Sequence, residues 1–272
     1  MSSAAPLLRY RGNQIENTNS TSFGLEMNED YATRAGKDLG VLLRNVASID
    51  GGLSIHKMKE SVPSEIPAFE RILSSLEDQL KMRKSLLPSK TISLQKYMKE
   101  RNIMKILSFF DPYTLSNIQL EDQIEDTPQF DRMDDLVKSE HWKRAKTLTI
   151  ERSCDQPLKN FHHFDGAQFF IREFSAQELF ELKEVRLQKG TRWRRRFEFK
   201  YQKMSGKEKL NTLLGGPPSV DQFGIWSTWL FPIPDKGAVL ELKMRRYAVE
   251  LMVIDKKYTS GDAEYHPEFI IN

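Results

Sequence analysis

A complete structural unit is contained in residues 104–120, MKILSFFDPYTLSNIQL, and this stretch decides the fold. Apolar residues recur three and four positions apart up to Phe110, which is the pattern of a helix with one buried face. Pro112 disfavours helical backbone in the residue before it, so we expect a helix that begins at about Met98 and ends at Phe110. Residues 118–120, IQL, then alternate apolar and polar side chains as a half-buried strand does. The stretch predicts a helix that leads directly into a short strand.

The same unit recurs along the chain, because similar strand cores return after intervals that helical patterns fill. The cores are Leu53-Ser54-Ile55, Ile92-Ser93-Leu94, Ile118-Gln119-Leu120, Leu148-Thr149-Ile150 and a fifth at Phe169-Phe170-Ile171. Such units cannot bury their apolar faces alone and must stack on one another. We therefore predict an α/β fold, a curved stack of strand–helix units that is leucine-rich-repeat-like in layout. The unit spacing drifts and the consensus asparagine of such repeats is missing, so an ordinary mixed α/β domain is the alternative.

Three further helical patterns are indicated by the sequence. Residues 29–46 carry apolar side chains at three- and four-residue spacing and include Gly36 and Gly40. A second helix is expected over residues 130–142. Ser175 and Glu178 form a capping-box pair that opens a third helix.

The C-terminal part of the chain is expected to be β-rich. Alternating or apolar runs occur at residues 197–201, 226–231, 239–244 and 247–254. Arg245-Arg246 fits a tight hairpin between the last two runs. We predict a flexible N-terminal arm over residues 1–22, one α/β interaction domain over residues 23–255, and a C-terminal tail over residues 256–272.

The composition places the chain among intracellular globular proteins. Of its 272 residues 39% are hydrophobic, which is enough for one sizeable core. The formal charge of +3 is too small to indicate a dedicated nucleic-acid-binding protein. The single cysteine excludes a framework of disulfides within the chain and favours a reducing compartment, cytoplasmic or nuclear. No apolar run approaches the length of a membrane span, so we expect no membrane partner.

Five segments resemble a known family when they are taken in order. They are Asp38–Asn45, Met104–Leu115 with the strand after it, His141–Ile150, Asn160–Phe164 with Phe169–Ile171, and Trp229–Pro234 with Val239–Leu242. These segments resemble the FTH domain of nematode F-box A proteins, and the resemblance extends over residues 25–254.

The resemblance implies a role in target recognition. In that family an F-box usually precedes the FTH domain and docks on the Skp adaptor of a cullin ubiquitin ligase, while the FTH region is taken to bind the target protein. The first 28 residues are too short and too polar for the apolar helices of an F-box, and we expect the F-box to be missing. The main expectation is a non-catalytic protein–protein interaction domain. The alternative is a substrate adaptor that binds Skp through a degenerate F-box.

Residue types that catalysis or metal binding would need are present, but their spacing in the sequence fits neither function. Cys154 has His141, His162 and His163 within a short stretch of sequence, yet no signature of a cysteine hydrolase surrounds it. His162 and His163 are adjacent, whereas helical zinc ligands stand three or four residues apart. We therefore expect no catalytic residue, no metal site and no cofactor.

Two features are candidates for binding a partner. The densest basic stretch runs from Lys189 to Lys209, and aromatic residues interleave with it. That pattern suits single-stranded RNA, where rings stack on bases, but it also suits a solvated strand or an acidic protein partner. Trp229 is either a core residue or, if its ring is exposed, an interface hot spot. The candidate partner-binding residues are Arg192, Trp193, Arg194, Arg195, Arg196 and Trp229.

Overall fold

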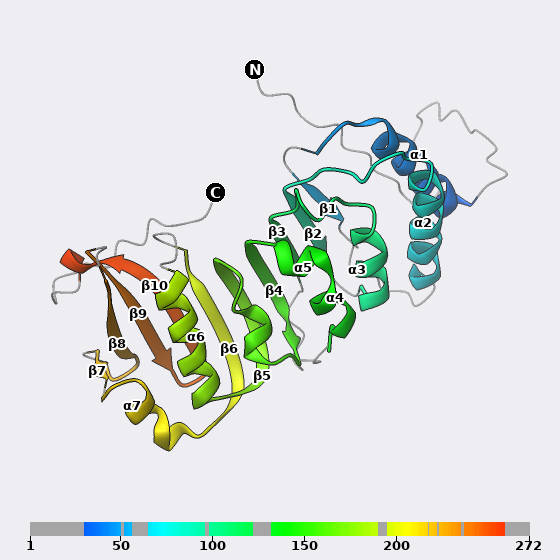
Figure 1. Ribbon diagram of the computed structural model, residues 1–272. Coiled ribbons are helices and arrows are strands. Elements are labelled where there is room, and N and C mark those ends of the chain that lie inside the picture. Colours follow the sequence, from blue (N-terminus) through cyan, green and yellow to red (C-terminus); the bar gives the residue numbers. More distant parts are fainter. Residues whose placement is uncertain are drawn as a thin grey trace, which may run out of the picture.

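The structure is a computed structural model that describes residues 30–49, 52–55, 65–95, 98–121, 132–189, 195–216, 218–221, 223–234 and 237–258 (Figure 1). The predicted arm over residues 1–22 and all but the first three residues of the predicted tail lie outside this part of the chain. The helices are α1 (Tyr31–Asn45), α2 (Glu65–Leu80), α3 (Glu100–Leu107), α4 (Asp134–Lys138), α5 (Glu140–Arg144), α6 (Ala176–Lys189) and α7 (Leu210–Leu213). The strands are β1 (Leu53–Ile55), β2 (Thr91–Gln95), β3 (Asn117–Glu121), β4 (Thr147–Cys154), β5 (Gly166–Ser175), β6 (Phe197–Ser205), β7 (Ser219–Val220), β8 (Ser227–Ile233), β9 (Ala238–Arg245) and β10 (Ala248–Asp255).

The ten strands form one sheet in the order β1-β2-β3-β4-β5-β6-β10-β9-β8-β7. Strands β1 to β6 are parallel, and each pairs with the next strand along the chain. Strand β10 pairs antiparallel with β6, and β9, β8 and β7 continue the sheet as an antiparallel meander. The protein is thus a mixed α/β structure with a β-rich C-terminal part. The curved, leucine-rich-repeat-like shape stays a prediction.

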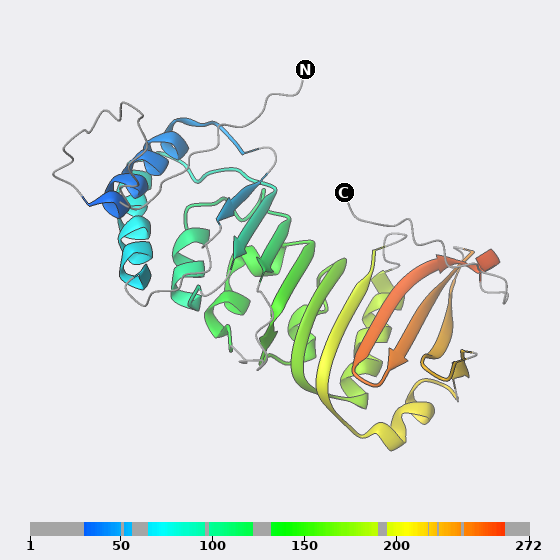
Figure 2. The ribbon, with the colours of Figure 1, turned by 180° about the vertical axis from the view of Figure 1, so that it is seen from behind.

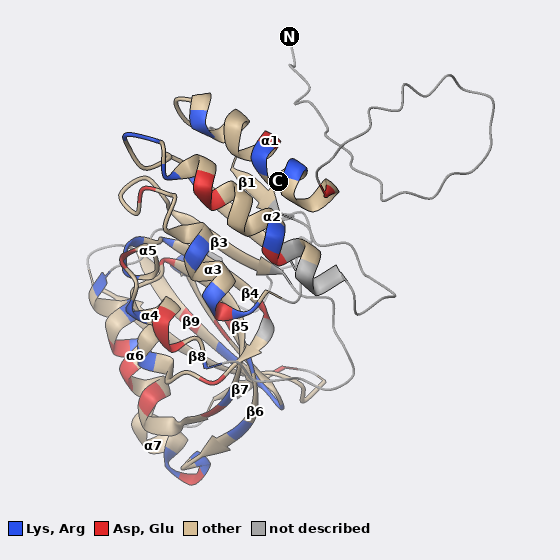
Figure 3. Cartoon of the chain, turned by 90° about the vertical axis from the view of Figure 1, so that its right-hand side faces the viewer, with Lys and Arg blue, Asp and Glu red and all other residues tan. Residues whose placement is uncertain are grey.

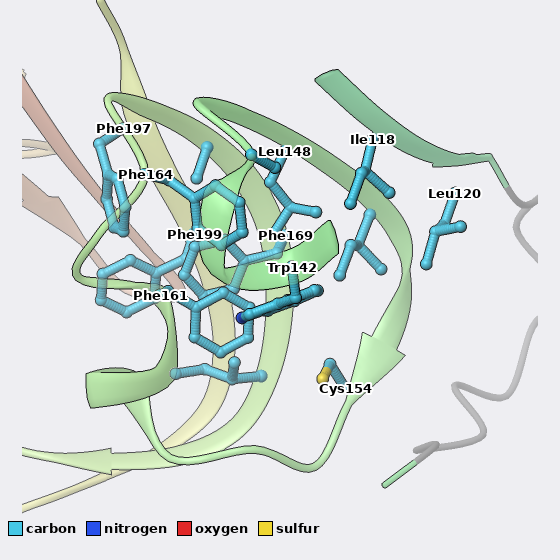
Figure 4. Packing of buried hydrophobic residues seen from close by; sticks show 14 of the residues in the cluster. Ile118, Leu120, Trp142, Leu148, Cys154, Phe161, Phe164, Phe169, Phe197 and Phe199 are labelled. Atoms are coloured by element: carbon cyan, nitrogen blue, oxygen red, sulfur yellow. The ribbon is translucent and has the colours of Figure 1, made fainter. Parts of the chain in front are cut away.

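The parallel half is held in register by apolar rows. Ile92, Ile118 and Leu148 are consecutive register partners on β2, β3 and β4, and a second row lies two residues further along each strand. These side chains are buried beneath the helices. Figure 4 shows Trp142 of α5 among the phenylalanines that continue this core toward β5 and β6. The alternating strand cores seen in the sequence are therefore the inward-facing rows of one sheet.

A backbone hydrogen bond repeats where one unit meets the next. The Lys90 carbonyl accepts from the N–H groups of the two residues that lead into β3, both at 3.0 Å. The Ser116 carbonyl does the same for β4, at 2.8 and 3.0 Å, and the Lys146 carbonyl for β5, at 2.7 and 3.4 Å. Because three successive strands begin in the same way, the units stack with a common geometry at their entry points.

Two glycines bring the first two helices together. In α1, Gly36 and Gly40 lie four residues apart and face α2. A Cβ atom on Gly36 would lie 2.4 Å from the Ile72 carbonyl oxygen, and one on Gly40 would lie 2.4 Å from the Cβ of Gln79. Only hydrogen at these positions allows the observed contact between the helices, so the glycines have a packing role that the sequence pattern did not reveal.

Two helices were predicted with wrong boundaries. The helix expected to end at Phe110 is α3, which ends at Leu107. The sequence pattern indicates a single helix over residues 130–142, whereas the structure has two short helices, α4 and α5, separated at Ser139. Ser139 has extended backbone angles, and its hydroxyl accepts from the Trp142 N–H at 3.2 Å. A serine at an N-cap commonly makes this bond. The new helix start turns Trp142 into the core, where its indole N–H donates to the Asn160 carbonyl at 3.0 Å.

Candidate interaction surface

The sheet has one face without helices in the described part of the chain. In Figure 1 helix α6 lies in front of β6, β9 and β10, and in Figure 2 it lies behind them. Figure 3 shows α3, α4, α5 and α6 together on one side of the strands. We call the opposite side the uncovered face. Its central row consists of consecutive register partners, Ser54, Ser93, Gln119, Thr149, Gln168, Glu198, Glu250, Lys243, Thr228 and Ser219. Every residue of this row is polar, which is the composition of a surface that meets water or another protein.

An ion-pair cluster occupies the middle of the uncovered face. Glu198 and Glu250 are directly opposite each other on β6 and β10, and they are only 8% and 7% exposed. Like charges in that position destabilise a sheet. Arg196 compensates for them, because its Nε lies 2.8 Å from Glu250 Oε1 and its Nη2 lies 3.3 Å from Glu198 Oε2. The Arg196 guanidinium thus stabilises the junction between the parallel and antiparallel halves.

The basic stretch of the sequence is divided between different environments. Arg192, Trp193 and Arg194 lie outside the described residues, and Arg195 is half-buried. The rings of Phe197 and Tyr201 project into the core. Rings in the core cannot stack on bases, so the described strand does not present the interleaved pattern that single-stranded RNA requires.

The lysines of the same stretch are also separated from one another. Lys189 donates to the His162 carbonyl at 2.9 Å, on the helix side of the molecule. Lys203 lies 3.7 Å from Glu173. Lys200 is exposed on the uncovered face, because it alternates with Phe199 and Tyr201 along β6. Lys200 belongs to the basic stretch and therefore remains available for binding on the uncovered face.

Trp229 is a core residue in the structure. Its side chain is 6% exposed, and its indole N–H donates to the Gly216 carbonyl at 3.0 Å. Of the two interpretations that the sequence left open, the structure therefore places Trp229 in the packed interior. Trp226 is only half-buried, and the Arg245 guanidinium lies 4.9 Å from its ring centroid.

The sequence pattern did not reveal that α6 carries a buried arginine, because the charged residues of this segment are typical of a solvent-exposed helix. Arg186 is 2% exposed, and its guanidinium donates to the carbonyls of Asp165 at 2.8 Å and Phe164 at 2.6 Å. Its Cζ lies 4.1 Å from the Phe197 ring centroid. Burial lowers the pKa of Arg186 to about 10, so the group stays charged at neutral pH. Arg186 fixes the turn before β5 to the helix above it.

The histidines His162 and His163 that were weighed for chemistry are half-buried, and the cysteine is buried. Burial lowers the pKa of both His162 and His163, and His163 Nε2 lies 2.7 Å from the Trp142 carbonyl oxygen. Cys154 is buried at the end of β4. Among the described residues, no three His, Cys, Asp or Glu side chains are grouped so that they could hold a metal ion. None of the described helices is both long and apolar enough to cross a membrane.

The comparison with protein families gives one match. A model of the FTH domain matches residues 70–213, which extend from the first half of α2 to the end of α7 and include β2 to β6. The comparison with curated proteins found no match. The matched segment contains the stacked strand–helix units and the start of the junction with the antiparallel meander. Because it covers just over half of the 272 residues, the chain belongs to the FTH domain family.

Proposed function

We propose that this protein is a non-catalytic protein–protein interaction domain that recognises a target protein through the uncovered face of its sheet. The observation that carries the proposal is the uninterrupted polar row across this face, from Ser54 on β1 to Ser219 on β7. A sheet with helices on one side offers a broad, rigid surface for another macromolecule. Membership of the FTH domain family supports an interaction role.

The rigidity of the surface follows from how the units are joined. The repeated carbonyl bonds at Lys90, Ser116 and Lys146 fix the starts of β3, β4 and β5 against the preceding strands. We propose that these units form a curved stack of the leucine-rich-repeat type. We further propose that the partner is an intracellular protein.

The proposal is tested by capturing partners with the full chain and with two matched variants. In the first variant, Gln119→Arg and Gln168→Arg place two long cations on the central row of the uncovered face. The control variant, Glu181→Arg, changes the exposed side of α6. We expect chemical cross-linking in a cell extract, read by mass spectrometry, to give the same specific partner with the wild type and the control.

The capture experiment has two outcomes that contradict the proposal. Equal recovery of the partner with the double variant would mean that the uncovered face is not the binding surface. The absence of any protein enriched over the bare matrix would contradict an interaction role. Circular dichroism of each variant establishes that its fold is intact before the capture is read.

A further inference from the structure

A second row of the uncovered face combines aromatic rings with cations. Phe170 on β5, Lys200 on β6, Ala248 on β10 and Arg245 on β9 are consecutive register partners. Trp226 continues the row, since its ring lies under the Arg245 guanidinium. We call these five residues the basic–aromatic row. Its members come from five segments of the chain, so only the sheet topology brings them together.

The cations of the basic–aromatic row differ in their ion pairing from the cations beside them in and around the central row. In the central row, Lys243 lies 3.0 Å from Glu241, and the glutamates are bound by Arg196. Among the described residues, Lys200 and Arg245 have no carboxylate within 4.0 Å. The basic–aromatic row therefore has positive charge that no carboxylate of the described residues neutralises.

Exposed apolar side chains lie next to the row, in the β7–β8 turn and the β9–β10 turn. Phe223 is 74% exposed, and Ile225 and Tyr247 are each more than half exposed. Asp221 fixes the first turn, because its Oδ1 accepts from the N–H groups of Ile225 at 2.7 Å and Trp226 at 3.2 Å. A turn held in this way presents its apolar side chains without a further ordering cost on binding.

This composition is that of a protein interface. Binding hot spots are enriched in Trp, Tyr and Arg, and interface cores are enriched in aromatic residues. Exposed apolar patches rimmed by polar groups commonly mark interaction sites. The unneutralised cations select the charge of the partner, because complementary potentials favour an acidic segment.

We propose that the basic–aromatic row and the adjoining turns bind an acidic segment of a partner protein that also carries aromatic or leucine side chains. This inference rests on the proposed function, since it names the chemistry of the segment that such a partner presents. Carboxylates of the segment pair with Lys200 and Arg245, and its apolar side chains pack on Phe223 and Tyr247. The site lies beyond residue 213, outside the segment that the family model matches, apart from Phe170 and Lys200.

A protein segment fits this surface better than a nucleic acid does. Single-stranded nucleic acids are bound by aromatic faces that are free to stack on bases. The Arg245 guanidinium lies over the Trp226 ring, and the exposed side chains beside it include the aliphatic Ile225. Aliphatic side chains offer no stacking surface, whereas leucine or phenylalanine of a peptide packs on them.

The test uses the full chain as bait for a phage library of random 16-residue peptides, followed by fluorescence anisotropy with the synthetic peptides that are selected. Two variants change the site, Phe223→Ala and Arg245→Glu. The matched control is Tyr113→Ala, because Tyr113 is an equally exposed aromatic residue with Arg144 4.0 Å from its ring centroid. Thermal melting of each variant confirms that it is folded.

We expect the selected peptides to combine Asp or Glu with Phe, Trp or Leu. Their Kd should rise at least tenfold with either site variant and stay within twofold for the control. Raising the salt concentration should weaken binding, because the pairs on this surface are exposed to solvent.

Four results would overturn the inference. Selected peptides without acidic residues, or peptides that bind Arg245→Glu as tightly as the wild type, would place binding elsewhere and leave the proposed function standing. Binding of fluorescein-labelled dodecauridylate that depends on Arg245 and displaces the peptides would identify a nucleic-acid site instead. If no peptide is enriched, the inference fails, and the cross-linking experiment above decides the proposed function separately.

Discussion

At the scale of single residues, Arg186 shows how one charge can hold two elements together. It belongs to α6, yet its guanidinium bonds the carbonyls of Phe164 and Asp165 in the turn before β5. A buried carbonyl that loses a charged donor is left unsatisfied, at a cost of roughly 1–3 kcal/mol each. Arg186 therefore stabilises the fold because it supplies a hydrogen-bond donor to both carbonyls of this turn.

We expect Arg186→Met to lower the free energy of unfolding by about 3 kcal/mol, because the methionine keeps the apolar contact with Phe197 and loses both hydrogen bonds. Urea denaturation monitored by circular dichroism measures the change. The control is Arg34→Met, which removes an exposed ion pair with Asp38 and should cost less than about 0.5 kcal/mol. Equal stability of the two variants would contradict the structural role of Arg186.

At the scale of elements, the contact between α1 and α2 depends on the absence of side chains at Gly36 and Gly40. Alanine would favour an isolated helix by up to about 1 kcal/mol per residue relative to glycine. In this structure the added methyl group at Gly36 would meet the backbone of α2, which cannot move aside as a side chain does. The helix propensity and the packing therefore act in opposite directions, and the packing should dominate.

Gly36→Ala should accordingly lower the free energy of unfolding by up to about 2 kcal/mol, which is the difference between an overpacking cost of roughly 1–3 kcal/mol and a propensity gain of about 1 kcal/mol. Differential scanning calorimetry would record this as a lower Tm. Lys37→Ala, at the exposed neighbouring position of α1, is the control and should leave Tm nearly unchanged. An increase in Tm for Gly36→Ala would mean that α1 can move away from α2 without loss.

At the scale of the whole molecule, the parallel units and the antiparallel meander share one sheet and one buried cluster. Strand β6 pairs with β5 on one side and with β10 on the other. The buried cluster continues without interruption from Leu43 in α1 to Val253 in β10. Arg196 and Glu250 pair across the same boundary, so neither half has a complete core or a satisfied edge alone.

A chain that ends at Leu213, where the family match ends, should therefore not fold cooperatively. Such a chain loses β7 to β10, which uncovers Phe197 and Phe199 and leaves Glu198 without part of its ion-pair cluster. Thermal melting by circular dichroism and resistance to trypsin would show the loss. A chain that ends at residue 258 serves as the control and should melt as the full protein does; cooperative melting of the shorter chain would show that the parallel units are an independent domain.

The sequence by itself determined the strand cores, because alternation of apolar and polar residues is a local property that survives folding. It also gave the capping pair at Ser175 and Glu178, whose Ser175 N–H donates to the Glu178 carboxylate at 2.9 Å. It failed at Ser139, where the pattern of one helix hides an N-cap, and at Arg186, where burial depends on a turn more than 20 residues earlier. Only the tertiary structure decided that β10 pairs with β6. That pairing places Lys200, Arg245 and Trp226 in one row, because long-range strand order follows from the packing of the whole core and leaves no mark on any short stretch of sequence.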